Sequence, residues 1–88
     1  MTPALPRGVR VHWDKVRETH VLLGPERALM LDPIATEILK RVDGEASEAS
    51  ICAELAETFG APIEQVSGDV RTFLADLADK RLLDARDG

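Results

Sequence analysis

The stretch Arg27-Ala28-Leu29-Met30-Leu31-Asp32-Pro33 marks the point at which the chain changes from strands to helices. Residues 27–31 form a short, largely apolar run that is typical of a strand. Asp32 and Pro33 then form a helix start, because an aspartate accepts hydrogen bonds from free amides and proline suits the first helical position. The sequence therefore predicts strands before this stretch and helices after it.

Two further strands are predicted upstream. Residues 9–14 alternate between apolar and polar side chains, which is the pattern of a strand with one buried face. Residues 19–23 form an apolar and β-branched run that ends at Gly24-Pro25. Because strands so close in sequence usually pair, we expect a three-stranded antiparallel meander with residues 27–31 at one edge.

Three helices are predicted downstream. The first ends at Asp43-Gly44, the second begins after Ser47 and ends at Gly60, and the third runs over residues 63–80. Their apolar stripes are Ile34, Ile38, Leu39 and Val42; Ile51, Cys52, Leu55, Ala56 and Phe59; and Ile63, Val66, Val70, Phe73, Leu74 and Leu77. The order indicates an α+β fold, winged-helix-like, with a three-stranded antiparallel sheet followed by three helices that cover one face of it.

The chain length of 88 residues allows one hydrophobic core. Prolines near the start predict a flexible N-terminal tail at 1–7. The domain itself is expected at 8–83, followed by a C-terminal tail at 84–88. Leu82 and Leu83 are expected to pack back onto the core. The only large aromatic side chains of that core would be Trp13, Phe59 and Phe73.

Charge and composition exclude several classes of protein. The net charge of −5 repels phosphate backbones and anionic lipid, so nucleic acid is a poor partner. No apolar stretch approaches the length of a membrane span, and the N-terminus lacks the pattern of a secretory signal. Cys52 has no partner for a disulfide, which makes the cytoplasm the expected compartment.

No group of residues in the sequence has the pattern of a metal site or a catalytic site. His12 and His20 lie on different predicted strands and Cys52 lies on an apolar helical stripe, so neither a metal nor another cofactor is expected. The serines and threonines lie mainly at caps or on helix faces, without a glycine-framed nucleophile turn. The acidic residues of the helices, Asp69 among them, indicate a solvated outer face. We therefore do not expect an enzyme.

The third predicted strand is unusual for an edge strand, because residues 28–31 are apolar on both alternating faces. Edge strands normally carry protective charge, and an unprotected edge favours the addition of a strand from a peptide. Alternatively, the last helix covers the second face and nothing docks there. The residues alone do not separate these interpretations, nor do they tell which of Leu29 and Met30 faces a groove.

The run Val21-Leu22-Leu23-Gly24-Pro25-Glu26-Arg27, followed by Leu31-Asp32, resembles the PqqD family, the peptide chaperones of pyrroloquinoline quinone (PQQ) biosynthesis. The similarity spans about positions 3 to 83, and this run is its specific part. The segment 15–20 departs from the family, which tends to have glycine and then an aromatic there, and Arg81 replaces a common glycine. The remaining matches are Ile38-Leu39, Val42-Asp43-Gly44, Asp69-Val70, Phe73-Leu74 and Lys80-Arg81-Leu82-Leu83.

The resemblance implies that the domain binds the ribosomally made precursor peptide PqqA. It would present this peptide to PqqE, a radical S-adenosylmethionine enzyme, and would do no chemistry itself. In related leader-recognition domains the peptide adds as a strand beside the third strand and fills the groove before the third helix. The implied site is Arg27, Ala28, Leu29, Met30 and Leu31 with Val66, Asp69, Val70, Phe73, Leu74 and Leu77.

Two other functions remain open at this stage. A winged-helix DNA-binding or regulatory domain would use the second and third helices, although the acidic third helix argues against it. An inert dimerisation domain would pair the exposed edge with a second copy. We expect a monomer.

Overall fold

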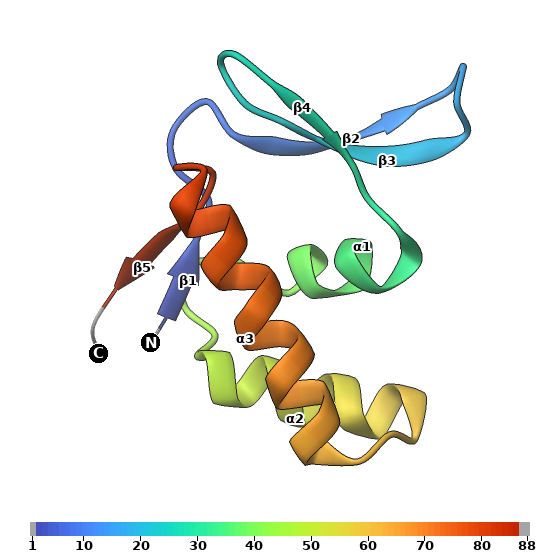
Figure 1. Cartoon of the computed structure of the whole chain (residues 1–88), viewed down its shortest axis with the longest axis vertical. Helices are drawn as coiled ribbons and strands as arrows, with labels where there is room; N and C mark the ends of the chain where they lie inside the picture. The colour runs from blue at the N-terminus through green and yellow to red at the C-terminus, as the bar shows by residue number, and fades with distance from the viewer. Residues whose placement is uncertain (1, 87–88) are drawn as a thin grey trace.

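The computed structural model describes residues 2–86 as two small antiparallel sheets and three helices (Figure 1). Strands β2, β3 and β4 pair in that order and precede the helices, which confirms the predicted α+β arrangement. The elements are β1 (Thr2–Ala4), β2 (Arg10–Asp14), β3 (Thr19–Leu23), β4 (Ala28–Met30), α1 (Pro33–Lys40), α2 (Glu48–Phe59), α3 (Ile63–Asp79) and β5 (Asp84–Arg86).

The register of the three-stranded sheet assigns side chains to its two faces. Val11, Leu22 and Leu29 stand opposite one another across β2, β3 and β4, and this face belongs to the core. Leu22 is fully buried at its centre. On the outer face, Met30 of β4 lies opposite the buried Val21 and is 68% exposed. The alternation therefore directs Leu29 toward the helices and Met30 away from them.

The predicted helix caps form as expected from local chemistry. The Oδ1 of Asp32 accepts a hydrogen bond from the N–H of Ala35 at 2.7 Å, and the Oγ of Ser47 accepts one from Ser50 at 3.1 Å. Gly60 ends α2 with a φ of +60°, in the left-handed region that favours glycine. Each cap depends on residues close in sequence, which is why the sequence predicts it.

The predicted end of the first helix at Asp43-Gly44 is wrong. α1 ends at Lys40, and Gly44, with a φ of +83°, lies in the following loop. The Oδ1 of Asp43 accepts from the N–H groups of Glu45 and Ala46, both at 2.8 Å. An aspartate that bonds backbone amides just beyond itself forms a turn in competition with the helix.

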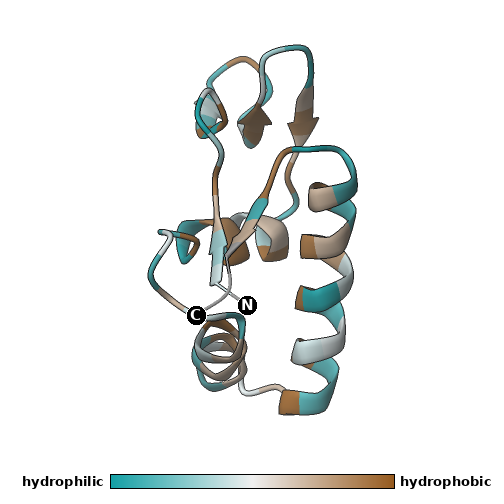
Figure 2. Cartoon of the chain, turned by 90° about the vertical axis from the view of Figure 1, so that its left-hand side faces the viewer, coloured by the Kyte–Doolittle hydropathy of each residue, from teal (hydrophilic) through white to brown (hydrophobic). Residues whose placement is uncertain are grey.

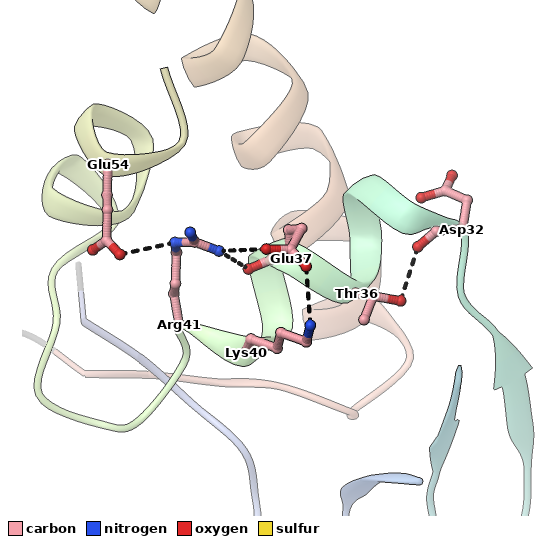
Figure 3. A network of polar contacts seen from close by, with 6 residues as sticks. All are labelled: Asp32, Thr36, Glu37, Lys40, Arg41 and Glu54. Atoms are coloured by element: carbon pink, nitrogen blue, oxygen red, sulfur yellow. Dashed lines mark hydrogen bonds and ion pairs between the residues drawn. The ribbon is translucent and has the colours of Figure 1, made fainter. Parts of the chain in front are cut away.

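Polar contacts tie α1 to α2 (Figure 3). Glu37 accepts from the Nζ of Lys40 and from the Nη1 of Arg41, both at 3.1 Å, and these bonds lower the pKa of Glu37. The Nε of Arg41 donates to Glu54 of α2 at 3.1 Å. The network links the C-terminal end of α1 to α2.

The core lies between the sheet and the helices. Figure 2 shows the hydrophobic segments of α3 on the side that faces the rest of the fold. Leu82 and Leu83 pack back onto this core as predicted, and Cys52 is buried in it. Its buried members are Val9, Leu22, Leu31, Ala35, Ile38, Leu39, Val42, Ile51, Cys52, Leu55, Val70, Leu74, Leu77, Leu82 and Leu83.

Several large apolar side chains do not enter the core. Trp13 and Phe59, which the sequence analysis placed there, are 47% and 52% exposed, and Ile34 is 58% exposed. Ile63 is likewise exposed. Aliphatic side chains fill the interior, so these residues at the ends of elements stay on its margin. Phe73 is only partly buried against the core.

The two chain ends differ most from expectation. Residues 2–4 and 84–86, expected in tails, form strands that pair with each other, and Pro3 lies opposite Ala85. Pro3 is fully buried, and Ala4 is 4% exposed. The expectation of irregular tails is therefore wrong for these residues, because proline is tolerated in an edge strand. Residues 1, 87 and 88 lie outside the described residues, and the domain limits at 8 and 83 stay a prediction.

Candidate functional site

The backbone of β4 has one edge bonded to β3 and one edge that no strand within residues 2–86 covers. Hydrogen bonds of 2.9 Å tie Arg27 and Leu31, on either side of β4, to the β3 side. In an antiparallel ladder, residues bonded to the partner alternate with residues whose amide and carbonyl point away from it. Leu29 is thus bonded to β3, whereas Ala28 and Met30 direct their backbone groups to the uncovered edge.

A groove of about 440 Å³ lies beside this edge, between β4, α1 and α3. Its floor includes Leu77, which is 1% exposed, so the floor belongs to the fixed core. The lining consists of Leu29, Met30, Leu31, Asp32, Ile34, Ala35, Ile38, Asp69, Phe73, Asp76, Leu77 and Lys80. An extended chain along the uncovered edge would place alternate side chains in this groove.

A second cavity of about 200 Å³, which we call the end pocket, continues the groove toward the turn between α2 and α3. The two cavities share Ile34, Ile38 and Asp69, and so they are contiguous. The remaining lining of the end pocket is Leu55, Phe59, Ala61, Gln65, Val66 and Val70.

The structure brings most of the predicted site residues together. The groove contains Leu29, Met30, Leu31, Asp69, Phe73 and Leu77, and the end pocket contains Val66, Asp69 and Val70. Three predicted residues line neither cavity. Leu74 is 1% exposed in the core, Arg27 lines a separate hollow beside Lys80 and Arg81, and Ala28 can offer only its outward backbone. That these residues bind a peptide stays a prediction.

The first turn of α1 contributes to the site, although the predicted site residues do not include it. Ile34 lines both the groove and the end pocket, and Ala35 and Ile38 complete that wall. The signal was present, because the short Asp32-Pro33 connection must place the first helical turn next to the end of β4. Ile34 was instead assigned to the core stripe from helical periodicity.

The groove is apolar at its floor and charged along its rim. Asp76 forms an ion pair with Lys80, and Asp32 is used as the α1 cap, which leaves Asp69 as an exposed carboxylate between the two cavities. Exposed ion pairs contribute about 1 kcal/mol or less, so apolar burial would dominate binding here. The arrangement suits an extended peptide with apolar side chains and no acidic residue facing Asp69.

Other sites receive no support from the part of the chain that the structure describes. Within residues 2–86, His, Cys, Asp and Glu side chains nowhere gather in a group of three that could hold a metal. In the same stretch of the chain, no helix is both long and apolar enough to cross a membrane.

Comparison with known proteins places the fold in a family. The family of "Coenzyme PQQ synthesis protein D (PqqD)" matches residues 19–83. The chain belongs to the PqqD family. Its similarity to a "PqqA binding protein" of Rhizobium meliloti is 49% identity over 80 residues, which is 91% of this chain and 82% of that protein.

One further relative by sequence and one by structure come from a protein in which PqqD is fused to PqqC. The chain is 45% identical, over 93% of its length, to a "Bifunctional coenzyme PQQ synthesis protein C/D" of Methylorubrum extorquens, of which it covers 22%. The solution structure of the PqqD part of PqqCD from Methylobacterium extorquens, described as a functional and stand-alone RiPP recognition element, aligns with a TM-score of 0.82 at 44% identity. The alignment covers 94% of this chain and 88% of the chain in that solution structure.

A crystal structure of PqqD from Xanthomonas campestris aligns with a TM-score of 0.65 at 41% identity, covering 97% of this chain and 94% of that one. Both structures confirm the fold that the sequence predicts.

Proposed function

We propose that this chain binds the precursor peptide PqqA as an added strand along β4 and presents it to the radical S-adenosylmethionine enzyme PqqE. The observation that carries the proposal is the uncovered edge of β4, where Ala28 and Met30 direct their backbone groups outward beside an apolar groove. The names of the PqqD relatives support the identity of the peptide. The protein would act as a cytoplasmic monomer without a catalytic step of its own.

The magnitudes indicate how the binding energy would be divided. Two outward residues offer up to four main-chain hydrogen bonds, which contribute about 1 kcal/mol each. Two buried apolar side chains add about 2 kcal/mol each, and ordering a flexible peptide costs about 2–5 kcal/mol. Micromolar affinity requires about 8 kcal/mol. The peptide must therefore bury further side chains, for which the end pocket has room.

The backbone of Met30 provides the sharpest test. Met30→Pro removes the outward N–H while leaving the ladder to β3 intact, so we expect PqqA affinity to fall about fivefold or more. Met30→Ala keeps the N–H and removes the same exposed side chain, and it should lose much less. Titration calorimetry with PqqA measures both affinities. Equal affinities of the two variants on folded protein would contradict strand addition.

Leu29→Pro is a control that tests which residues of β4 bond to β3. The N–H of Leu29 points toward β3, so this change should lower the free energy of unfolding by about 2 kcal/mol or more. Met30→Pro should stay close to wild type in urea unfolding.

Amide-shift titration with unlabelled PqqA should move the resonances of β4, α1 and α3. Saturable shifts confined to other elements would place the peptide elsewhere.

A further inference from the structure

A second apolar hollow lies on the other side of the β4–α1 connection from the groove. It has a volume of about 450 Å³ and lies between the paired strands β2 and β3, α1 and the end of α2. Trp13, Ile34 and Phe59 line it and are each about half exposed. The Trp13 ring packs edge-on against His20 with centroids 4.8 Å apart, which holds it at the wall. We call this cavity the aromatic hollow.

The aromatic hollow gathers exposed apolar side chains around one concavity. Large apolar side chains scattered singly on a surface are normal, whereas several around one concavity mark an interaction site. The contrast is Val16, which is 93% exposed in the turn between β2 and β3 and lines none of the cavities described above. Tryptophan is also enriched among the residues that contribute most to binding energy in protein interfaces.

A peptide in the groove would not fill the aromatic hollow. The groove is lined by Leu31 and Asp32, whereas the hollow is lined by Pro33, and the chain that connects β4 to α1 passes between them. Ile34 lines both cavities, and Phe59 lines both the hollow and the end pocket. An extended strand that continues into the end pocket would touch Phe59 at the margin of the hollow, but Trp13 and Thr58 line neither the groove nor the end pocket. A second molecule can occupy the hollow while the groove holds the peptide.

We propose that the aromatic hollow is the docking site for the enzyme that modifies the bound peptide, which inserts a projecting apolar side chain between Trp13 and Phe59. This inference rests on the proposed function. Continuity through Ile34 would place the enzyme directly beside the peptide strand. A second copy of this chain is a poorer occupant, because each copy carries a net charge of −5 and the two would repel. The same charge favours an enzyme surface with basic residues around its apolar anchor.

Two variants separate this hollow from the groove. Trp13→Ser removes the aromatic wall. Thr58→Arg fills the hollow with a cation, which the C-terminal turn of α2 tolerates because of the helix dipole. Both positions lie outside the groove and the end pocket. We expect the affinity for PqqE, measured by biolayer interferometry on the PqqA-bound protein, to fall about tenfold or more in both. PqqA affinity should stay within about twofold.

Val16→Ser is the matched control, since it removes an exposed apolar side chain from the adjoining turn without touching the hollow. It should retain wild-type affinity for PqqE. The inference is overturned if Thr58→Arg, shown folded by its amide spectrum, binds PqqE as tightly as wild type. It is also overturned if PqqA alone shifts the Trp13 indole resonance, or if sedimentation shows a dimer that Thr58→Arg dissociates. Failure of wild-type protein to bind PqqA would instead refute the proposed function.

Discussion

At the scale of single residues, β4 shows how neighbours in sequence differ in role. Leu29 directs its side chain to the core and its backbone to β3, while Met30 directs its backbone to the uncovered edge. The sequence indicates that Leu29 and Met30 face opposite sides of the sheet. It does not indicate which of them faces the core, because both residues are apolar. The two hydrogen bonds at Arg27 and Leu31 settle which of them bonds to β3.

Replacing each of two glycines with alanine tests side-chain packing at this scale. A Cβ on Gly24 would lie 2.7 Å from the Cδ2 of Leu82, which is 2% exposed and has little room to move. We expect Gly24→Ala to lower the free energy of unfolding by about 1–3 kcal/mol through overpacking. A Cβ on Gly68 in α3 would meet nothing within 4 Å. Gly68→Ala should therefore raise stability by up to about 1 kcal/mol through helix propensity.

Urea unfolding of both variants at 25 °C provides the measurement. A Gly24→Ala protein as stable as wild type would contradict this packing of Gly24 against Leu82. Gly68 lines neither the groove nor the end pocket, so Gly68→Ala should bind PqqA as wild type does.

At the scale of elements, α1 and the loop after it depend on two ionised carboxylates. Hydrogen bonds from Lys40 and then Arg41 lower the pKa of Glu37 below its usual 4.5. Those from the N–H groups of Ala46 and then Glu45 lower the pKa of Asp43 below 3.8. A carboxyl with a lowered folded-state pKa stabilises the fold above its unfolded-state value, and this contribution is lost as the pH falls through the folded-state value.

We therefore expect stability to decline as the pH drops below about 4.5, partly through these groups. The variant Glu37→Gln with Asp43→Asn should be less stable than wild type at pH 7 and should show a shallower decline toward about pH 3. Urea midpoints recorded across this range provide the test. Parallel curves for the two proteins would show that other groups control the acid response.

The elements also show which local rules were reliable. The caps at Asp32, Ser47 and Gly60 followed from the sequence because each involves hydrogen bonds within one turn. The end of α1 did not, because the sequence of Asp43-Gly44 suits both a helix stop and a free turn. Helical periodicity placed Ile34 and Phe59 in the core, although each lies near an end of its helix, where the neighbouring layer no longer covers it.

At the scale of the whole molecule, β1 and β5 join the two ends of the chain (Figure 1). We expect removal of residues 1–5 to lower the free energy of unfolding by about 2–3 kcal/mol, because Pro3 and Ala4 are buried. Removal of residues 84–88 should cost a similar amount. If the strands stabilise the fold through their pairing, removing both should cost less than the sum of the two losses.

Thermal and urea unfolding of the three truncated proteins test this coupling. Strictly additive losses would mean that each strand acts through separate contacts. Neither strand lines the groove, so folded truncated proteins should still bind PqqA.

The sequence by itself determined the order of the three-stranded sheet and the three helices, the caps at Asp32, Ser47 and Gly60, the acidic charge, and the presence of an unprotected apolar strand at the sheet edge. These depend on residues within a few positions of one another, or on composition. The tertiary structure alone decided the phase of the β4 ladder, the pairing of β1 with β5, and the gathering of Trp13, Ile34 and Phe59 around one hollow. Such features depend on register and on which layer covers which side chain. Local propensity leaves those choices undetermined, because they are fixed only when distant segments pack together.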